Sequence, residues 1–311
     1  MNPRPNHSQS LASRITKAAS RQTYYTIRLL ADRERAADAY RAYGYFRWVD
    51  DILDEEKETS VEKLKFVYRQ QALLEACYRG EKLDALCDEE QILVDLIEND
   101  REENSGLQIY LRNMMGVMLF DAKRKGRIIS QDELTEYSHL LATAVTEALY
   151  YFIGHTDPAP YHAARYLSVT AAHITHMLRD TLEDTVVGYF NIPQEYLRAH
   201  KIKPSDVECP AYREWVYDRV QLAYLYFRAG RYYIAQTTNL RRRLAGYAYT
   251  ARFEWILHAI ERDNYILRRD YPERKSLRAG LWMLGYVLTS TLTFQKNKAG
   301  HQSRLYHQWL H

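Results

Sequence analysis

The sequence predicts an all-α protein, and three observations lead to that prediction. Proline, which disrupts helix interiors, is absent between Pro5 and Pro158. The same stretch is rich in Ala, Leu, Arg, Glu and Lys, which have high helix propensity. No region shows the sustained alternation of β-branched and polar residues that a half-buried strand requires. A bundle of long helices is therefore expected.

Local motifs predict where helices begin and end. Residues 59–62 (TSVE) and 130–133 (SQDE) fit the capping box, in which a hydroxyl and a later carboxylate satisfy free backbone N–H groups. A further helix start is expected at residues 204–206 (PSD). Clusters of Gly, Pro and polar residues predict breaks, which fall at 98–106, 155–161, 188–193 and 209–210.

The chain is expected to form a single helical domain over residues 13–311, because no Pro- or Gly-rich linker divides it. The prolines near the start predict a flexible N-terminal tail over residues 1–12. The most apolar stretch, residues 279–294, is shorter than the roughly 18 to 20 apolar residues of a spanning helix. It also carries Ser and Thr, which favours a buried helix, with a membrane-facing surface as the alternative.

Composition indicates an ordinary globular protein of a reducing compartment. Apolar residues make up 46% and charged residues 27%, and the net charge of +3 gives no electrostatic case for nucleic-acid binding. Cys77, Cys87 and Cys209 form neither a metal-binding spacing nor an even disulfide set. The N-terminus lacks the apolar core of a signal peptide, so a cytoplasmic location is expected.

Two clusters of aspartates stand out. Asp50 and Asp54 are four residues apart, so on a helix both carboxylates share one side, and Asp180 and Asp184 repeat this spacing. Like charges at that spacing repel, and apolar neighbours make an unpaired carboxylate costly. Mg²⁺, completed by water and substrate phosphates, would turn the repulsion into attraction. A solvated acidic face is the alternative, which an arginine beside each cluster disfavours.

The sequence around these clusters resembles the squalene/phytoene synthase family. The run ASRQTYYTIRLLADRERAADAYRAYGYFRWVDDILDE at 19–55 resembles the family's first aspartate region. The run HITHMLRDTLEDTVVGYFNIPQEYL at 173–197 resembles the second, with R-D-x-x-E-D followed by G-x-x-x-x-P. Residues 116–149 resemble its central helix pair and 232–265 its late helices, so the resemblance covers roughly residues 18–275.

The resemblance implies a helical bundle of the isoprenoid synthase type with a central cavity. It implies Mg²⁺-dependent head-to-head condensation of two farnesyl or geranylgeranyl diphosphates, through a cyclopropyl intermediate, to a squalene- or phytoene-type product. By this resemblance Asp50, Asp54, Asp180 and Asp184 would hold Mg²⁺, or Mn²⁺ in its place, on the diphosphates. Use of NADPH stays open, because the family's reductive members lack an ordinary dinucleotide fingerprint and none is present here.

Five further residues match family positions near the diphosphates. Arg47 and Arg179 are expected to grip phosphate or lock the carboxylates, with a structural ion pair as the alternative. Tyr43 and Tyr265 match tyrosines near the diphosphate sites, and are expected to be catalytic. Ser20 matches the first serine of the family's S-x-S-F-Y segment and is expected to bind diphosphate. For the last three, ordinary packing or hydrogen bonding is the alternative.

The sequence departs from the family at several positions. His173 and His176 replace the family's Q-x-x-N and share one helix side. They would bind diphosphate as imidazolium, accept a proton from a cationic intermediate, or replace amide hydrogen bonds; a zinc site lacks a nearby third ligand. Thr143 and Thr146 stand in the family's small A-G-x-V-G turn and would narrow the substrate channel. Residues 22–23 also differ.

Two other functions remain as alternatives. The altered positions motivate a diverged enzyme that ionises one prenyl diphosphate and cyclises or hydrolyses it. A non-catalytic scaffold is the second alternative, which the four retained aspartates argue against. The sequence leaves the oligomeric state open. A peripheral membrane contact through residues 281–292 or the basic segment 268–278 is a further hypothesis.

Overall fold

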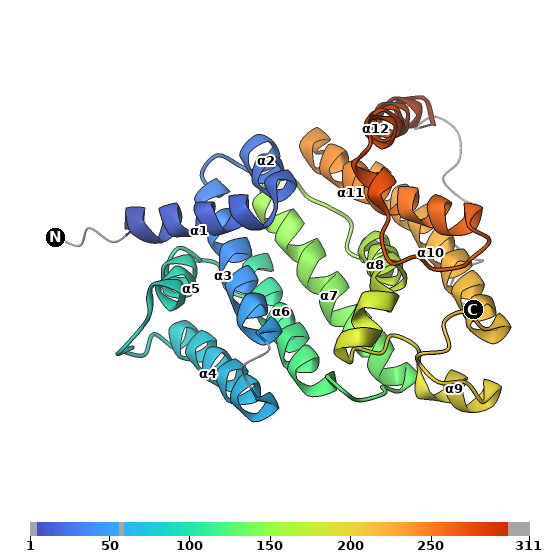
Figure 1. Cartoon of the computed structure of the whole chain (residues 1–311). Helices are drawn as coiled ribbons and strands as arrows, with labels where there is room; N and C mark the ends of the chain where they lie inside the picture. The colour runs from blue at the N-terminus through green and yellow to red at the C-terminus, as the bar shows by residue number, and fades with distance from the viewer. Residues whose placement is uncertain (1–4, 56–58, 298–311) are drawn as a thin grey trace.

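The computed structural model describes residues 5–55 and 59–297, and these residues are almost entirely helical (Figure 1). Within those ranges there is no β-strand, so the predicted all-α class is confirmed. The elements in chain order are α1 (Pro5–Ala19), α2 (Arg21–Leu30), α3 (Ala36–Asp54), α4 (Ser60–Tyr78), α5 (Asp88–Glu98), α6 (Gly106–Arg124), α7 (Gln131–Phe152), η1 (Ala163–Arg165), α8 (Leu167–Val187), α9 (Gln194–His200), α10 (Pro210–Gln236), α11 (Leu240–Arg262), η2 (Pro272–Lys275) and α12 (Leu277–Asn297).

Both predicted capping boxes are confirmed. At the start of α4, the Glu62 N–H donates to Thr59 Oγ1 at 3.3 Å and the Thr59 N–H donates to the Glu62 carboxylate at 2.9 Å. Ser130 and Glu133 make the same pair of hydrogen bonds at the start of α7, at 3.2 and 2.8 Å. Each cap satisfies backbone N–H groups that a helix start leaves without partners.

The helix start predicted at residues 204–206 is wrong. The Asp206 carboxylate accepts a hydrogen bond from the Lys203 N–H at 2.8 Å, which closes a turn instead of capping a helix. Helix α10 begins at Pro210, with the Cys209 sulfur accepting from the Tyr212 N–H at 3.4 Å. Proline suits this first helical position because its missing N–H would have had no partner there.

The N-terminal segment is helical, which corrects the predicted flexible tail over residues 1–12. Helix α1 begins at Pro5, and Ala12 is fully buried against α3. A Cβ added at Gly44 would lie 3.0 Å from the Ala12 Cα, so the two helices approach closely. Proline is favourable in the first turn of a helix, and Pro5 takes that position in α1. Residues 1–4 lie outside the described residues.

Two hydrophobic clusters fill the interior, one on each side of the molecule. The first draws on α1 and α3–α7, and the second on α7–α11. Phe120 of α6 packs against both clusters. Figure 1 shows α6 and α7 between α3 on one side and α8 on the other. The two aspartate-bearing helices therefore face the same central pair of helices from opposite sides.

Helix α12 is only half buried, although the sequence favours a buried helix over residues 279–294. Ala279 is fully buried and Trp282 packs against α11, whereas Leu281 and Leu284 are exposed. No helix among the described residues has both the length and the apolar character needed to cross a membrane.

Close packing of α10 on the start of α8 depends on Gly230. A Cβ added there would lie 2.7 Å from the backbone nitrogen of Ser168. We expect Gly230→Ala to lower the free energy of unfolding by about 1–3 kcal/mol, as overpacking does. Gly285→Ala is the matched control, because an added Cβ there meets no atom within 4 Å and alanine favours the helix. Urea unfolding of both variants checks this, and equal midpoints would contradict the close approach.

Candidate active site

The first aspartate cluster lies on α3. Arg47 Nη1 lies 3.1 Å from Asp50 Oδ2, and the other Nη of Arg47 donates to Asp51. Burial, followed by the charge of the nearby Asp54 carboxylate, raises the pKa of Asp50 to about 6. The Asp50 side chain is nonetheless 41% exposed. The carboxylate can be reached from solvent, although the surrounding protein disfavours its charged form. Such a carboxylate is accessible to a ligand.

The second cluster lies on α8. Asp180 accepts two hydrogen bonds from Arg179, both at 2.5 Å, and lies 3.1 Å from His176 Nε2. Asp184 accepts from Asn191 Nδ2 at 2.7 Å. Burial raises the pKa of Asp184 to about 6, and the charge of Asp180 also raises it. In the ligand-free protein Arg47 thus pairs with Asp50 and Asp51, and Arg179 pairs with Asp180. The roles expected of the two arginines at phosphate or at the carboxylates stay predictions.

Asp121 of α6 lies between the clusters, and sequence reasoning did not single it out. Its carboxylate accepts from Arg124 Nε at 2.7 Å and from the Tyr137 hydroxyl at 3.0 Å. After the larger effect of burial, the Asp121 charge raises the pKa of Asp50 and also that of Asp184. One carboxylate is thus near enough to contribute to the raised pKa of an aspartate in each cluster.

Arg124 extends this network to the second cluster. Its Nη1 donates to Asn191 Oδ1 at 2.8 Å, and Asn191 in turn donates to Asp184. The buried guanidinium lies 4.8 Å from the ring centres of both Tyr137 and Tyr189. A continuous chain of contacts therefore runs from Asp121 on α6 to the acidic end of α8. The sequence signal for this network is an Asp and an Arg three residues apart in the last turns of α6.

Arg252 of α11 is a second residue that sequence reasoning missed. Burial lowers its pKa, and the nearby charges of Arg179 and Arg274 lower it further. No hydrogen bond or ion pair is recorded for Arg252 in the part of the chain that the structure describes. Tyr43 is close enough to Arg47 and to Arg252 to raise the pKa of each guanidinium group. Arg47, Arg179, Arg252 and Arg274 thus place positive charges beside the carboxylates. Recognition of a diphosphate requires such charges.

The two histidines differ in their surroundings. His173 is buried, with Nδ1 3.2 Å from Ser138 Oγ and its ring edge-on to Tyr137 at 4.8 Å. Burial holds the pKa of His173 well below its usual value, so this imidazole is neutral at pH 7. Burial and then the Arg179 charge lower the pKa of His176 to about 4. Neutral rings favour the hydrogen-bonding alternative for His173 over an imidazolium that grips phosphate.

Two predicted site residues are not joined to the aspartates by any contact recorded among the described residues. Ser20 caps α2, since its Oγ accepts from the Thr23 N–H at 3.1 Å. Tyr265 follows α11 with a positive φ of 63° and packs edge-on to Tyr217 at 5.0 Å. Their roles in diphosphate binding and catalysis stay predictions.

Thr143 and Thr146 of α7 carry hydroxyls that are buried and have no hydrogen-bond partner among the described residues. An unpaired buried hydroxyl is unfavourable unless water or a ligand satisfies it. The predicted narrowing of a substrate channel by these side chains stays a prediction.

The donor set of the two clusters suits Mg²⁺. Carboxylate oxygens are the ligands this ion prefers, and it keeps several positions for water and phosphate oxygens. In the described part of the chain no three His, Cys, Asp or Glu side chains converge closely enough to hold a metal ion by themselves. A pair of carboxylates would therefore need substrate oxygens to complete the shell. The pKa values of Asp50 and Asp184 are raised first by burial and then by neighbouring carboxylates, and a bound cation would offset both effects.

The raised pKa values predict a pH dependence of stability for the ligand-free protein. An aspartate titrates near 3.9 in the unfolded chain and near 6 at these two positions. Their contribution to stability is thus fully present below about pH 4 and is lost as the pH rises through about 6. The double variant Asp50→Asn/Asp184→Asn has no titrating group at these positions, so it does not undergo this loss. The free energy of unfolding of the variant minus that of wild type should therefore increase from pH 4 to pH 7. Urea unfolding across that range checks the sign, and a difference independent of pH would contradict it.

Fold and sequence together define a class of protein, namely an all-α bundle with one aspartate pair on α3 and another on α8, two helices that lie on opposite sides of α6 and α7. The sequence matches the squalene/phytoene synthase family over residues 16–279, and the chain belongs to that family. The resemblance seen in the aspartate motifs is thereby confirmed.

Two relatives show how far the sequence similarity extends. Presqualene diphosphate synthase of Zymomonas mobilis is 29% identical over 206 residues, which cover 65% of this chain and 65% of that protein. The chloroplastic phytoene synthase of an Oncidium hybrid cultivar is 26% identical over 255 residues, covering 78% of this chain and 59% of that protein. The similarity thus spans less than two thirds of the length of either relative.

Two solved structures share the fold. The squalene synthase HpnC from Alicyclobacillus acidocaldarius superposes with a TM-score of 0.67 at 16% identity, covering 86% of this chain and 98% of that chain. A dehydrosqualene synthase in complex with ligand gives 0.70 at 15% identity, covering 94% and 98%. These likenesses confirm the expected isoprenoid synthase fold.

Proposed function

We propose that this chain catalyses the Mg²⁺-dependent head-to-head condensation of two prenyl diphosphates. The observation that carries the proposal is the chain of hydrogen bonds from Asp121 of α6, through Arg124 and Asn191, to Asp184 of α8, with α6 also packed against α3, the helix that carries Asp50. Two diphosphate sites facing each other would hold two prenyl chains side by side, as a condensation requires. Membership of the squalene/phytoene synthase family supports the same reaction.

Asp50 and Asp54 would hold Mg²⁺ at one diphosphate, and Asp180 and Asp184 at the other. When bound, the ion neutralises the diphosphate and makes it a better leaving group. Mn²⁺ also accepts carboxylate oxygens and is expected to substitute. Farnesyl and geranylgeranyl diphosphate are the proposed substrates, and a squalene- or phytoene-type hydrocarbon formed through a cyclopropyl intermediate is the proposed product.

Arg47 and Arg179 form ion pairs with carboxylates that the metal would need. When a metal-bound diphosphate arrives, their guanidinium groups can exchange the carboxylates for phosphate oxygens, which they bind with the same two-pronged geometry. Arg252 has no acidic partner to give up among the described residues, so it is available to phosphate at once. The apolar side chains between α3 and α8 would exclude water from the carbocation.

The proposal is tested by sizing the product. The purified protein is incubated with Mg²⁺ and either farnesyl or geranylgeranyl diphosphate, with and without NADPH, and with EDTA as the control. Extracts are analysed by mass spectrometry before and after phosphatase treatment, so that a cyclopropyl diphosphate is detected as well as a hydrocarbon. A product with twice the carbon number of the input, lost in EDTA, is expected.

Two results would contradict the proposal. A product of single chain length would favour the enzyme that ionises one diphosphate and cyclises or hydrolyses it. No product from either input, with the protein folded, would favour the scaffold alternative. The NADPH arm separates a reductive from a non-reductive final step.

A further inference from the structure

Helix α12 carries a stripe of four exposed leucines that no part of the described chain covers. Leu277, Leu281, Leu284 and Leu288 are 81%, 61%, 56% and 51% exposed. Their spacing of four, three and four residues places them on one side of the helix. Monomeric proteins rarely leave several large apolar side chains contiguous on the surface, so the leucine stripe indicates an interaction site.

The opposite side of α12 is fixed to the body of the protein. Trp282 packs against Trp255 at 5.5 Å and against His258 at 5.6 Å, both on α11. Ala279 is fully buried, and the Tyr286 hydroxyl accepts from Arg231 Nη1 at 3.0 Å. The helix is therefore docked through its aromatic side at the edge of the molecule (Figure 1), and its four leucines remain exposed.

The charges at the N-terminal end of the leucine stripe are predominantly positive, and Glu273, which pairs with Arg262 and Arg268, is the one carboxylate on η2 and α12. No aspartate or glutamate follows Glu273 in the sequence, whereas six of the 43 basic residues do. Arg274, Lys275 and Arg278 stand at the N-terminal end of the stripe. Arg278 is exposed and has no ion pair among the described residues. In a chain with a net charge of only +3, this end is a local basic surface, which is complementary to an anionic one.

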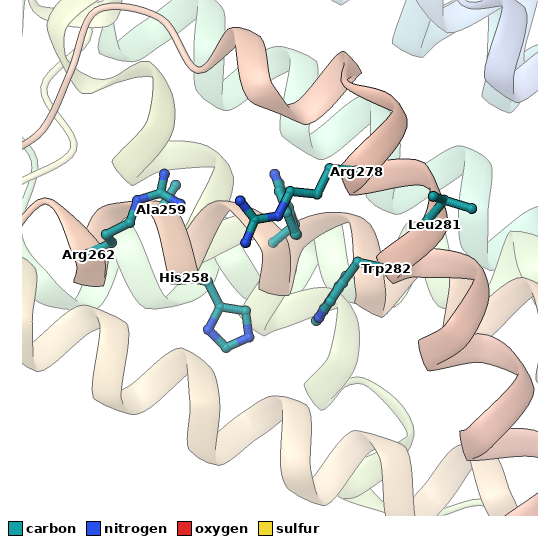
Figure 2. Close-up of a pocket in the computed structure, with 7 residues that line it drawn as sticks. His258, Ala259, Arg262, Arg278, Leu281 and Trp282 are labelled. Atoms are coloured by element: carbon teal, nitrogen blue, oxygen red, sulfur yellow. The ribbon is translucent and has the colours of Figure 1, made fainter.

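Beside the stripe, α11 and α12 enclose a recess of about 530 Å³ (Figure 2). Arg262 and Arg278 line it together with Leu281 and Trp282, so cationic, aromatic and aliphatic groups meet at one opening. Arginine binds phosphate oxygens, and tryptophan favours the boundary between water and an apolar phase. This combination is typical of helices that lie in the interface of a bilayer.

We propose that the leucine stripe and the adjoining recess dock this protein on the surface of a bilayer that contains anionic lipids. The leucines would enter the boundary between headgroups and acyl chains, and Arg262 and Arg278 would meet lipid phosphates. A second copy of the chain is the competing occupant. It would offer the same predominantly basic face, whose one carboxylate on η2 and α12, Glu273, is already paired with Arg262 and Arg268, so it supplies little charge complementarity. The inference does not depend on the proposed reaction.

Vesicle sedimentation tests the proposal with the full chain and no substrate. The vesicles are phosphatidylcholine alone or phosphatidylcholine and phosphatidylglycerol in equal parts. Leu281→Ser/Leu284→Ser removes the centre of the stripe, and Leu29→Ser/Val61→Ser is the matched control, because both of its positions are equally exposed on other helices. Arg278→Glu tests the charge, with Lys65→Glu on α4 as its control. Exposed positions make misfolding an unlikely complication, and circular dichroism verifies each variant.

Wild type is expected to bind the mixed vesicles, to bind phosphatidylcholine less, and to be released by salt. The double leucine variant should lower the partition coefficient at least about tenfold, and Arg278→Glu about tenfold, with both controls unchanged. No binding of wild type, or equal binding of the double leucine variant, would overturn the proposal. So would light scattering that shows a wild-type dimer which the leucine variant dissolves without any effect on vesicles, because the face would then join two copies.

Discussion

Replacing Asp50 or Asp180 with asparagine is expected to lower kcat/KM for prenyl diphosphate condensation by about 10²–10³-fold, the usual cost of removing one electrostatic contact to a developing charge. Asparagine keeps the shape of aspartate but cannot supply the negative charge that holds a divalent cation. Because burial, and then repulsion from Asp54, raises the pKa of Asp50, Asp50→Asn should also be at least as stable as wild type at pH 7. Steady-state kinetics over a range of Mg²⁺ concentrations and thermal unfolding measure the two effects.

Asp51→Asn is the matched control for this prediction. Asp51 lies on the same helix and is exposed, and its carboxylate pairs with Arg47 instead of sharing the side occupied by Asp50 and Asp54. It should change kcat/KM by only a few-fold. If Asp50→Asn and Asp180→Asn retained activity close to that of Asp51→Asn, the carboxylate clusters would not be the metal sites.

Replacing Arg124 with methionine is expected to lower the free energy of unfolding by about 3–5 kcal/mol, because it leaves the buried Asp121 carboxylate without its cationic partner. The Asn191 side chain loses its donor in the same change. Adding Asp121→Asn removes the buried charge while an amide oxygen can still accept from Tyr137. The double variant should therefore recover much of the lost stability. Urea unfolding of the two single variants and the double variant measures the coupling.

A surface pair provides the comparison for Arg124. Arg112 donates two hydrogen bonds of 2.9 Å to Glu75, and both side chains are well exposed. Arg112→Met should cost less than about 1 kcal/mol, as exposed ion pairs do. If Arg124→Met were no more destabilising than Arg112→Met, the contacts from Asp121 to Asp184 would not form a structural connection between α6 and α8.

The helices and both aspartate pairs could be predicted because their signals are local. A capping box is contained in four residues. The spacing of four between Asp50 and Asp54 predicts that both lie on one side of a helix. The family motifs are also continuous runs, so they could be read without knowing how the helices pack. For these features the sequence contains the physical cause of the structure within one or two helical turns.

Asp121 and Arg252 could not be found in that way, because their importance depends on tertiary packing. Asp121 matters since α6 packs against α3 and against α7, which in turn packs against α8, and nothing within α6 reveals these neighbours. Arg252 acquires its position beside Arg179 through the docking of α11 on α8. The apolar composition of α12 likewise could not show which of its sides would remain uncovered.

The central claim is that each aspartate pair holds its own diphosphate, and counting bound ligands tests it most directly. Isothermal titration calorimetry with farnesyl thiolodiphosphate, whose sulfur bridge resists ionisation, gives the number of sites in the presence of Mg²⁺. The two-site arrangement predicts two ligands per chain for wild type and one for each double variant, Asp50→Asn/Asp54→Asn and Asp180→Asn/Asp184→Asn. One ligand per wild-type chain, lost in both variants, would contradict the claim, because both pairs would then serve a single diphosphate.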